Sequence, residues 1–248
     1  MNDRLKPILV IAATIGVIVF NYLAATGILG GIDPGAISDK YPTRITPASY
    51  AFAIWSLIYS GLVAFSIYQA LPKNLAQFRS IRTVYILSCA ANCAWLYFWH
   101  AEAILISLLV IFVLLGSLAF INVRLRETEK HGEYWLAKAP FGIYFGWVTA
   151  ATILNATIAL VYLNVRVSDS ATNLIGAGLL LIAAALGVII RFRLTNYFYP
   201  LAIAWALTAI AVKQSGQTLI VAAAAVGVIA CLLAAISFLM KMPSSETR

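Results

Sequence analysis

The sequence predicts an all-α integral membrane protein with about eight transmembrane helices, and three observations support this. Of its 248 residues, 62% are hydrophobic and 10% are charged, against roughly 25% charged in an ordinary soluble domain. The charges fall in short clusters between long uncharged runs, and a soluble domain could not keep so apolar a surface in solution. Finally, the basic residues are unequally shared among these clusters, as in proteins that cross a membrane in a fixed orientation.

Eight stretches without Asp, Glu, Lys or Arg define the expected spans. Each has at least 19 residues, and about 20 apolar residues in a helix cross a hydrocarbon core of about 30 Å. Within lipid, such segments satisfy their backbone hydrogen bonds as helices. The stretches are residues 8–30, 45–72, 83–101, 103–123, 139–165, 170–190, 194–212 and 214–240.

The third and fourth stretches meet without a Gly or Pro between them. One continuous helix over residues 83–123 would measure about 60 Å, twice the thickness of the hydrocarbon core. We therefore predict a tight hairpin near His100–Glu102. The last two stretches are separated by a single charged residue, Lys213. The boundary between them is therefore the least clearly marked of the boundaries between stretches.

The basic residues predict the orientation. If the spans alternate in direction, thirteen of the 17 Lys and Arg lie on the side of the N-terminus, and the four on the other side are Lys40, Arg44, Arg166 and Lys213. This bias predicts that both termini are cytoplasmic, and we expect a multi-pass protein of a bacterial inner (plasma) membrane. The net charge of +8 is then explained by topology and by contact with anionic membrane lipid, and we expect no nucleic-acid partner.

Several kinds of chemistry have no signal in the sequence. No Asp, Glu, Lys or Arg lies deep within a predicted span, which argues against ion-coupled transport. His100 and His131 each lack a second His at ligand spacing, and Cys89, Cys93 and Cys231 match no metal motif. No nucleophile–base pair or phosphate-binding loop is present. We therefore predict no catalytic residue, no metal site and no required cofactor.

Aromatic and amide side chains recur on single helix faces. The face of the third stretch carries Ser88, Asn92, Trp95 and Trp99, that of the fifth carries Tyr144, Trp147, Ala151 and Asn155, and the second carries Phe52, Trp55 and Tyr59. An amide facing lipid would be costly, so both Asn side chains should point into the bundle. The spacing is equally compatible with a helix-packing core and with an aromatic cavity for a flat hydrophobic ligand.

Three motifs in these stretches resemble those of a known family. They are Thr46-Pro47 followed by Ala53-Ile54-Trp55-Ser56-Leu57-Ile58-Tyr59, then Asn92-Cys93-Ala94-Trp95 with Phe98, and then Trp147-Val148 followed by Leu154-Asn155. Their order and positions resemble the tryptophan-rich sensory protein family, which includes the mitochondrial translocator protein, also called the peripheral benzodiazepine receptor. The chain departs from the family pattern at Ser49-Tyr50, where the family has a Trp, and at Ala53, where it has a Pro.

The resemblance covers roughly residues 1–164, the usual five helices of the family. It implies a five-helix ligand-binding bundle over residues 1–164, and leaves residues 165–248 as a three-helix C-terminal membrane extension. It also implies a pocket inside the five-helix bundle, capped by the loop of residues 31–46, and a homodimer as a candidate assembly. Members bind tetrapyrroles such as haem and porphyrins, sterols or benzodiazepine-type drugs. Taken together, the motifs and stripes give the candidate ligand-binding residues Trp55, Tyr59, Asn92, Trp95, Trp147 and Asn155.

We therefore predict a membrane receptor or transporter-like binder of a planar hydrophobic ligand, such as a tetrapyrrole or a sterol-like molecule. A tetrapyrrole would be a ligand of this protein rather than a required cofactor. Two alternatives remain open from the sequence. The chain could be a permease or a partner subunit without a tetrapyrrole ligand, or an enzyme that degrades porphyrin in light.

Overall fold

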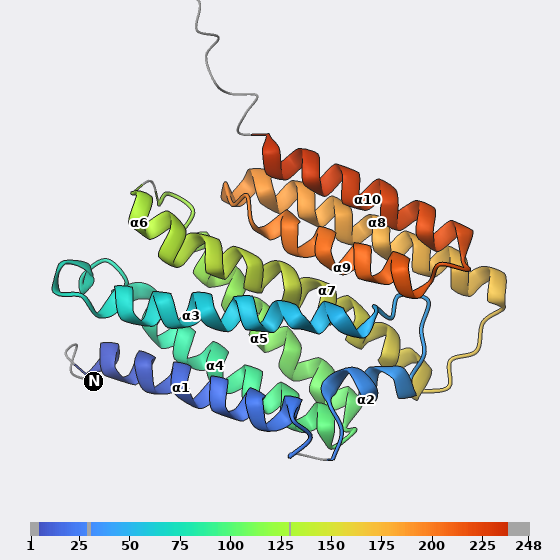
Figure 1. The fold of residues 1–248 in the computed structure, drawn as a ribbon, viewed down its shortest axis with the longest axis horizontal. Helices are drawn as coiled ribbons and strands as arrows, with labels where there is room; N and C mark the ends of the chain where they lie inside the picture. Colours follow the sequence, from blue (N-terminus) through green and yellow to red (C-terminus); the bar gives the residue numbers. More distant parts are fainter. Residues whose placement is uncertain (1–4, 29–30, 129, 238–248) are drawn as a thin grey trace, which may run out of the picture.

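The computed structural model describes residues 5–28, 31–128 and 130–237, and these residues form helices and connections without a strand (Figure 1). Each of the eight predicted stretches corresponds to one long helix, and five of these helices extend beyond their stretch at one or both ends. The ends of the first and last stretches, up to Gly30 and Met240, lie outside the described residues. The long helices are α1 (Lys6–Ala25), α3 (Ile54–Ala70), α4 (Arg79–His100), α5 (Ile104–Arg124), α7 (Ala139–Tyr162), α8 (Asp169–Leu194), α9 (Tyr199–Lys213) and α10 (Thr218–Ile236).

Six helical segments of the described chain are long and apolar enough to cross a membrane, which makes this an integral multi-pass membrane protein. These segments contain α1, α3, α5, α7, α8 and α10. Helix α4 has 22 residues but is more polar, and α9 has 15 residues, or about 22 Å at 1.5 Å per residue. All eight predicted helices thus exist, whereas the count of eight membrane crossings stays a prediction.

The predicted hairpin after the third stretch is confirmed. Helix α4 ends at His100 and α5 begins at Ile104. Glu102 between them adopts a left-handed φ of 52°, and the Ala103 N–H donates to the Phe98 carbonyl at 2.9 Å. The chain therefore reverses direction within three residues.

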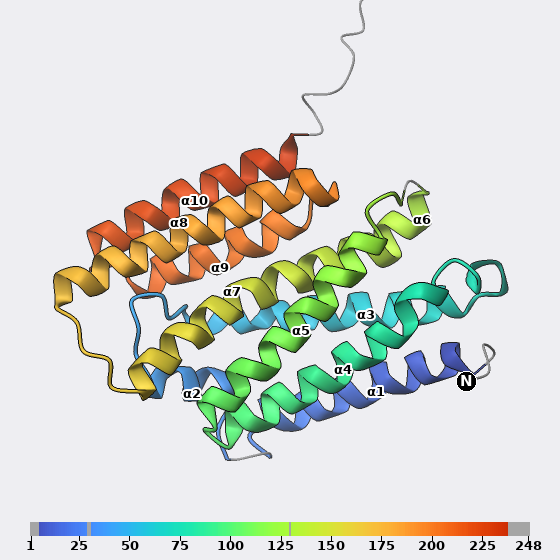
Figure 2. The ribbon, with the colours of Figure 1, turned by 180° about the vertical axis from the view of Figure 1, so that it is seen from behind.

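The helices form two groups that lie side by side. Helices α1, α3, α4, α5 and α7 pack as one bundle, and α8, α9 and α10 pack on one another as a three-helix layer, the extension (Figures 1 and 2). Successive long helices alternate in direction, so their connections fall alternately at the two ends of the molecule. The extension contacts the bundle mainly through α9 against α7.

Small residues bring α7 and α9 into close contact. Gly142 and Gly146 stand one turn apart on α7, the spacing at which paired helices approach closely in membranes. A Cβ at Gly146 would lie 2.5 Å from the Tyr199 carbonyl oxygen, so α9 packs directly on the α7 backbone. The Tyr199 hydroxyl also donates to Thr149 Oγ1 at 2.9 Å. Backbone contact and a buried hydrogen bond together fix the extension against the bundle.

A buried arginine lies at the end of the bundle where α3 is connected to α4. Arg82, near the start of α4, is 2% exposed. Its Nε donates to Gln69 Oε1 at 2.7 Å, its Nη2 to the Gln69 carbonyl at 3.0 Å and its Nη1 to the Leu75 carbonyl at 2.7 Å. These bonds hold the connection between α3 and α4, which includes the short 3-10 helix η2 (Pro72–Asn74).

The connection between α5 and α7 contains α6 (His131–Glu133) and a π-helical turn, η3 (Tyr134–Lys138).

The segment between α1 and α3 folds over the end of the bundle. It contains the short helix α2 (Pro34–Lys40) and the 3-10 helix η1 (Ser49–Ala53). Asp33 caps α2 by accepting hydrogen bonds from Gly35 N at 2.8 Å and Ala36 N at 3.1 Å. We call residues 33–48 the lid segment, because they cover the cavity described below.

Candidate functional site

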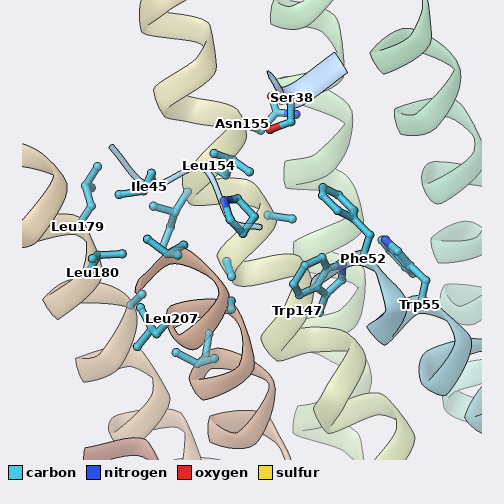
Figure 3. Close-up of a pocket in the computed structure, with 18 of the residues that line it drawn as sticks. Ser38, Ile45, Phe52, Trp55, Trp147, Leu154, Asn155, Leu179, Leu180 and Leu207 are labelled. Carbon is cyan, nitrogen blue, oxygen red and sulfur yellow. The ribbon is translucent and has the colours of Figure 1, made fainter. Parts of the chain in front are cut away.

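A cavity lies between the bundle and the extension, beneath the lid segment (Figure 3). The bundle wall comprises Phe52, Trp55, Trp95, Trp99, Trp147, Ala150, Ala151, Ile153, Leu154 and Asn155 from η1, α3, α4 and α7. The extension wall comprises Leu179, Leu180, Ala183, Ile203, Ala206, Leu207 and Ile210 from α8 and α9, and the lid segment contributes Ser38, Ile45 and Pro47.

The cavity is narrow in this structure. About 50 Å³ of it is accessible to the centre of a water molecule, which is room for a few waters, since each needs roughly 10–15 Å³ by this measure. A larger ligand therefore has to part the walls or displace the lid segment as it enters.

Trp55 lies at the centre of the aromatic rings beside this cavity. Its ring stacks on Tyr59 with centroids 5.5 Å apart and an interplanar angle of 15°, and it meets Tyr144 edge-on at 5.8 Å. It also contacts Trp95 at 6.2 Å and Trp147 at 6.3 Å. Offset and edge-to-face contacts of this kind stabilise aromatic groups beyond the burial of their surface. Trp55, Trp95 and Trp147 thus form one connected group of aromatic rings in the bundle wall.

Three buried polar atoms in the lining have no hydrogen-bond partner among the described residues. They are the indole Nε1 of Trp95, the indole Nε1 of Trp147 and the hydroxyl Oγ of Ser38. A buried polar group without a partner costs roughly 1–3 kcal/mol, so three of them around one apolar cavity need an explanation. A ligand that carries hydrogen-bond acceptors would satisfy all three.

The two candidate amides have different environments, although both are buried as predicted. Asn155 lines the cavity, and its amide faces Ser107 Oγ through long contacts of 3.3 and 3.4 Å. Asn92 lies outside the lining: its Oδ1 accepts from Asn21 Nδ2 at 2.7 Å, and its Nδ2 donates to the Tyr144 hydroxyl at 3.0 Å. Asn92 therefore joins α1, α4 and α7, as expected for an amide in a helix-packing core.

Charged and polar contacts tie the lid segment to both helix groups. On the bundle side, Glu102 accepts from Lys40 Nζ at 2.6 Å and from the Tyr41 hydroxyl at 2.8 Å. These two bonds hold the pKa of the Glu102 carboxyl below its ordinary value, while burial and the adjacent Glu102 raise the pKa of Tyr41 to about 12. On the extension side, Lys213 Nζ pairs with Asp39 at 3.2 Å and Gln214 Nε2 donates to the Thr43 carbonyl at 3.2 Å.

A family model described as TSPO-like protein matches residues 7–238 of this chain. The chain belongs to the TSPO-like protein family. No curated protein and no solved structure matches the chain in the other two comparisons. The matched region continues past residue 164 and includes α8, α9 and α10, so the helices expected to lie outside the family's region are part of it.

In this TSPO-like protein, four of the six candidate residues line one cavity. These are Trp55, Trp95, Trp147 and Asn155. Tyr59 lies outside the lining and stacks behind Trp55, and Asn92 belongs to the polar network described above. The resemblance implied a pocket inside the five-helix bundle, and that stays a prediction; the cavity described here has α8 and α9 as one of its walls.

Sequence reasoning missed several lining residues of this TSPO-like protein. Trp99 was not among the candidate residues, yet it is 4% exposed, lines the cavity and donates through Nε1 to the Pro34 carbonyl at 3.1 Å. Its place on the stripe with Trp95 was the signal that could have identified it. The extension wall gave no comparable signal, because Leu, Ile and Ala fill membrane helices everywhere.

Metal-ligating side chains form no cluster in the part of the chain that the structure describes. In residues 5–28, 31–128 and 130–237, no group of three or more His, Cys, Asp and Glu side chains is placed to hold a metal ion. His100 contacts its own helix through Nδ1, 2.8 Å from the Leu96 carbonyl oxygen.

Proposed function

We propose that this TSPO-like protein is a membrane receptor or transporter-like binder of a planar, largely apolar ligand with hydrogen-bond acceptors on its edge, with a tetrapyrrole as the first candidate. The observation that carries the proposal is the set of unpartnered polar atoms on Ser38, Trp95 and Trp147 around one apolar cavity. A ring ligand would pack on the aromatic bundle wall and accept hydrogen bonds from the two indoles. A sterol-like molecule with a single polar group would satisfy fewer of these donors.

In this proposal, each candidate residue either contacts the ligand or supports a residue that does. Trp55, Trp95 and Trp147 would contact the face of the ligand, and Asn155 would bond its edge after releasing its long contacts to Ser107. Tyr59 would support Trp55 by stacking. Asn92 would keep α1, α4 and α7 in register behind the site.

The test is a titration of the purified protein with protoporphyrin IX, followed by the absorption of the porphyrin itself so that loss of a Trp does not alter the readout. The variants are Trp95→Phe and Trp147→Phe, which keep an aromatic ring and remove the N–H donor. We expect saturable binding to the natural sequence and a loss of about tenfold in affinity for each variant, since one hydrogen bond contributes about 1 kcal/mol or somewhat more.

Trp135→Phe is the matched control, because Trp135 is half exposed and lies in η3, away from the cavity. Binding that never saturates, or three variants that behave alike, would contradict the proposal. A permease or partner subunit without a tetrapyrrole ligand would give that result. Loss of the porphyrin spectrum with new product bands under illumination would instead favour the light-dependent enzyme.

The remaining expectations on location and assembly stay proposals of the same kind. We propose a bacterial inner membrane with both termini cytoplasmic, contact with anionic lipid and a homodimer. Reporter fusions at the two ends test the orientation, and a C-terminal reporter outside the cytoplasm would refute it. The mass of the purified protein in detergent, corrected for bound detergent, tests the dimer.

A further inference from the structure

A second, wider hollow opens beside the cavity at the end where the lid segment passes α8. About 650 Å³ of it is accessible to the centre of a water molecule. Its lining combines apolar side chains from the end of α7 and the start of α8 with polar groups from the lid segment. We call this hollow the cleft. Its volume exceeds that of the narrow cavity and is large enough for an organic ligand.

The cleft carries two arginines. Arg44 comes from the lid segment, with 28% of its side chain exposed, and its Nη2 reaches Asp169 Oδ1 only at 3.5 Å. Arg166 comes from the connection between α7 and α8, is exposed, and pairs with no residue in the described part of the chain. Asp169, whose side chain is 96% exposed, is the acidic residue of the lining. A long ion pair with an exposed carboxylate contributes little, so Arg44 can exchange Asp169 for an anionic ligand.

The cleft and the cavity share one lining residue. Ile45, 3% exposed, lines both of them and directly follows Arg44. The segment lies close to α8, since a Cβ added at Gly176 would meet the Arg44 Cβ at 3.0 Å and the Ile45 Cγ2 at 3.7 Å. A ligand held by Arg44 would therefore have its apolar part next to Ile45, at the boundary of the aromatic cavity.

We propose that the cleft is the entry vestibule of the cavity, in which Arg44 and Arg166 bind the carboxylate groups of an anionic amphiphile while its apolar body moves past Ile45. This inference rests on the proposed function for the destination of the ligand. The anion site itself rests on the cleft and its two arginines. Arginine suits the role because its planar guanidinium binds a carboxylate through two parallel hydrogen bonds.

The experiment compares protoporphyrin IX with its dimethyl ester, which has the same ring and no carboxylate. The natural sequence binds the acid about tenfold more tightly than the ester, as expected of a partly exposed charge-assisted contact. Arg44→Gln removes that preference and leaves the affinity for the ester unchanged. Arg44→Lys restores part of the preference, and Arg166→Gln has a smaller effect than Arg44→Gln. The matched control is Arg193→Gln, which removes an exposed arginine outside both the cleft and the cavity.

The outcomes separate this inference from the proposed function. Equal, saturable binding of acid and ester that still weakens in Trp95→Phe overturns the vestibule and leaves the proposed function standing. Equal weakening of acid and ester by Arg44→Gln also overturns it, because the substitution would then act on the fold alone. The absence of saturable binding for both compounds overturns the proposed function.

A second measurement decides the anion site without the deep cavity. Phenylglyoxal modifies accessible arginines, and the extent of reaction at each residue is read by peptide mass spectrometry. Sodium octanoate, a small anionic amphiphile, slows the modification of Arg44 severalfold and leaves Arg193 unaffected, while the neutral octanol protects neither. Equal reaction of Arg44 with and without octanoate overturns the anion site.

Discussion

The two walls of the cavity are built from different chemistry. Five of the ten residues of the bundle wall carry aromatic rings and one carries an amide, and the indole Nε1 atoms of Trp95 and Trp147 have no hydrogen-bond partner among the described residues. The extension wall consists of aliphatic side chains alone, and Figure 3 shows Leu179, Leu180 and Leu207 opposite Phe52 and Trp147. Hydrogen-bond donors fix the orientation of a ligand, whereas aliphatic groups fix the shape that it can have. For the proposed ligand, the bundle wall would therefore set the orientation and the extension wall the size that is accepted.

Disrupting the contact between α7 and α9, which holds the two walls together, should have the largest effect on stability and on ligand affinity. In Gly146→Ala, the added Cβ meets the Tyr199 carbonyl at 2.5 Å and the Ala202 Cβ at 2.9 Å, and backbone on α9 cannot move aside cheaply. We expect a loss of about 1–3 kcal/mol in the free energy of unfolding, as for other overpacked sites. The midpoint of thermal unfolding in detergent measures the loss, and ligand affinity should fall with it.

Gly178→Ala is the control for this substitution, because nothing lies within 4 Å of a Cβ added at that position of α8. Alanine also favours a helix over glycine by about 1 kcal/mol, so the control should be neutral or slightly stabilising. Similar losses in both variants would mean that the contact between α7 and α9 does not hold the extension in place.

Filling the extension wall should change ligand size selection with a smaller effect on stability. Ala183→Leu adds a branched side chain to the wall, and we expect about a tenfold loss of affinity for a ring ligand, or about 1.4 kcal/mol. Thermal unfolding should change by less than in Gly146→Ala. Ala185→Leu, which adds the same group to an exposed position of α8, should leave affinity unchanged. Unchanged affinity in Ala183→Leu would remove the extension from the site.

Removing the ion pair between the lid segment and the bundle should have the smallest effect, and we expect it in the rate of ligand release. In Glu102→Gln, the lid segment loses its pairing with Lys40, and we expect ligand release to become about twofold to fivefold faster, because exposed ion pairs contribute at most about 1 kcal/mol. Stopped-flow release of bound porphyrin measures this rate. The corresponding substitution on the extension side is Lys213→Gln, which removes the ion pair between Lys213 and Asp39.

The pH dependence of release distinguishes these two ties. Because the folded pKa of Glu102 is lowered, its contribution is fully present above the ordinary carboxyl value of 4.5 and is lost as the pH falls through the lowered pKa. Release should therefore accelerate in strongly acidic solution in Lys213→Gln, which lacks the pair with the Asp39 carboxylate, and that acid step should disappear when Glu102→Gln is added to it. The Tyr41 hydroxyl keeps its proton until the pH approaches about 12, so its bond adds no step near neutrality. An acid step that persists in the double variant would contradict the assignment.

The sequence predicted the bundle wall better than the extension wall for a physical reason. Trp55, Trp95 and Trp147 stand out in a membrane helix, since rings and amides that recur on one face need neighbours other than lipid. Asn92 shared the α4 stripe with Trp95 and yet belongs to helix packing, because its partner Asn21 lies on α1, and no spacing within α4 reveals that pairing. Leu180 and Ala183 could not be identified at all, since aliphatic residues facing a cavity and facing lipid look alike.

The same reason explains what could be predicted of the fold. Long uncharged runs located all eight helices, and the length limit on a single helix located the turn at Glu102. The packing of α9 on α7 depends on Gly142 and Gly146 meeting Asn196 and Tyr199, which are contacts between residues more than 50 positions apart. The sequence therefore predicted the helices, whereas the position of the extension, which supplies seven of the twenty lining residues of the candidate site, became apparent only in the structure.

The alternation of the long helices has a consequence for the sidedness of the chain. In the described residues, the bundle contains five long helices that alternate in direction, so α7 ends at the opposite end of the molecule from the start of α1. The three helices α8, α9 and α10 then return the chain to the end where α1 begins. If all eight long helices cross the membrane, as predicted, a chain cut after Asn164 would end on the other side of the membrane. The extension would then determine the side on which the chain emerges after α10, in addition to supplying seven of the twenty residues that line the cavity.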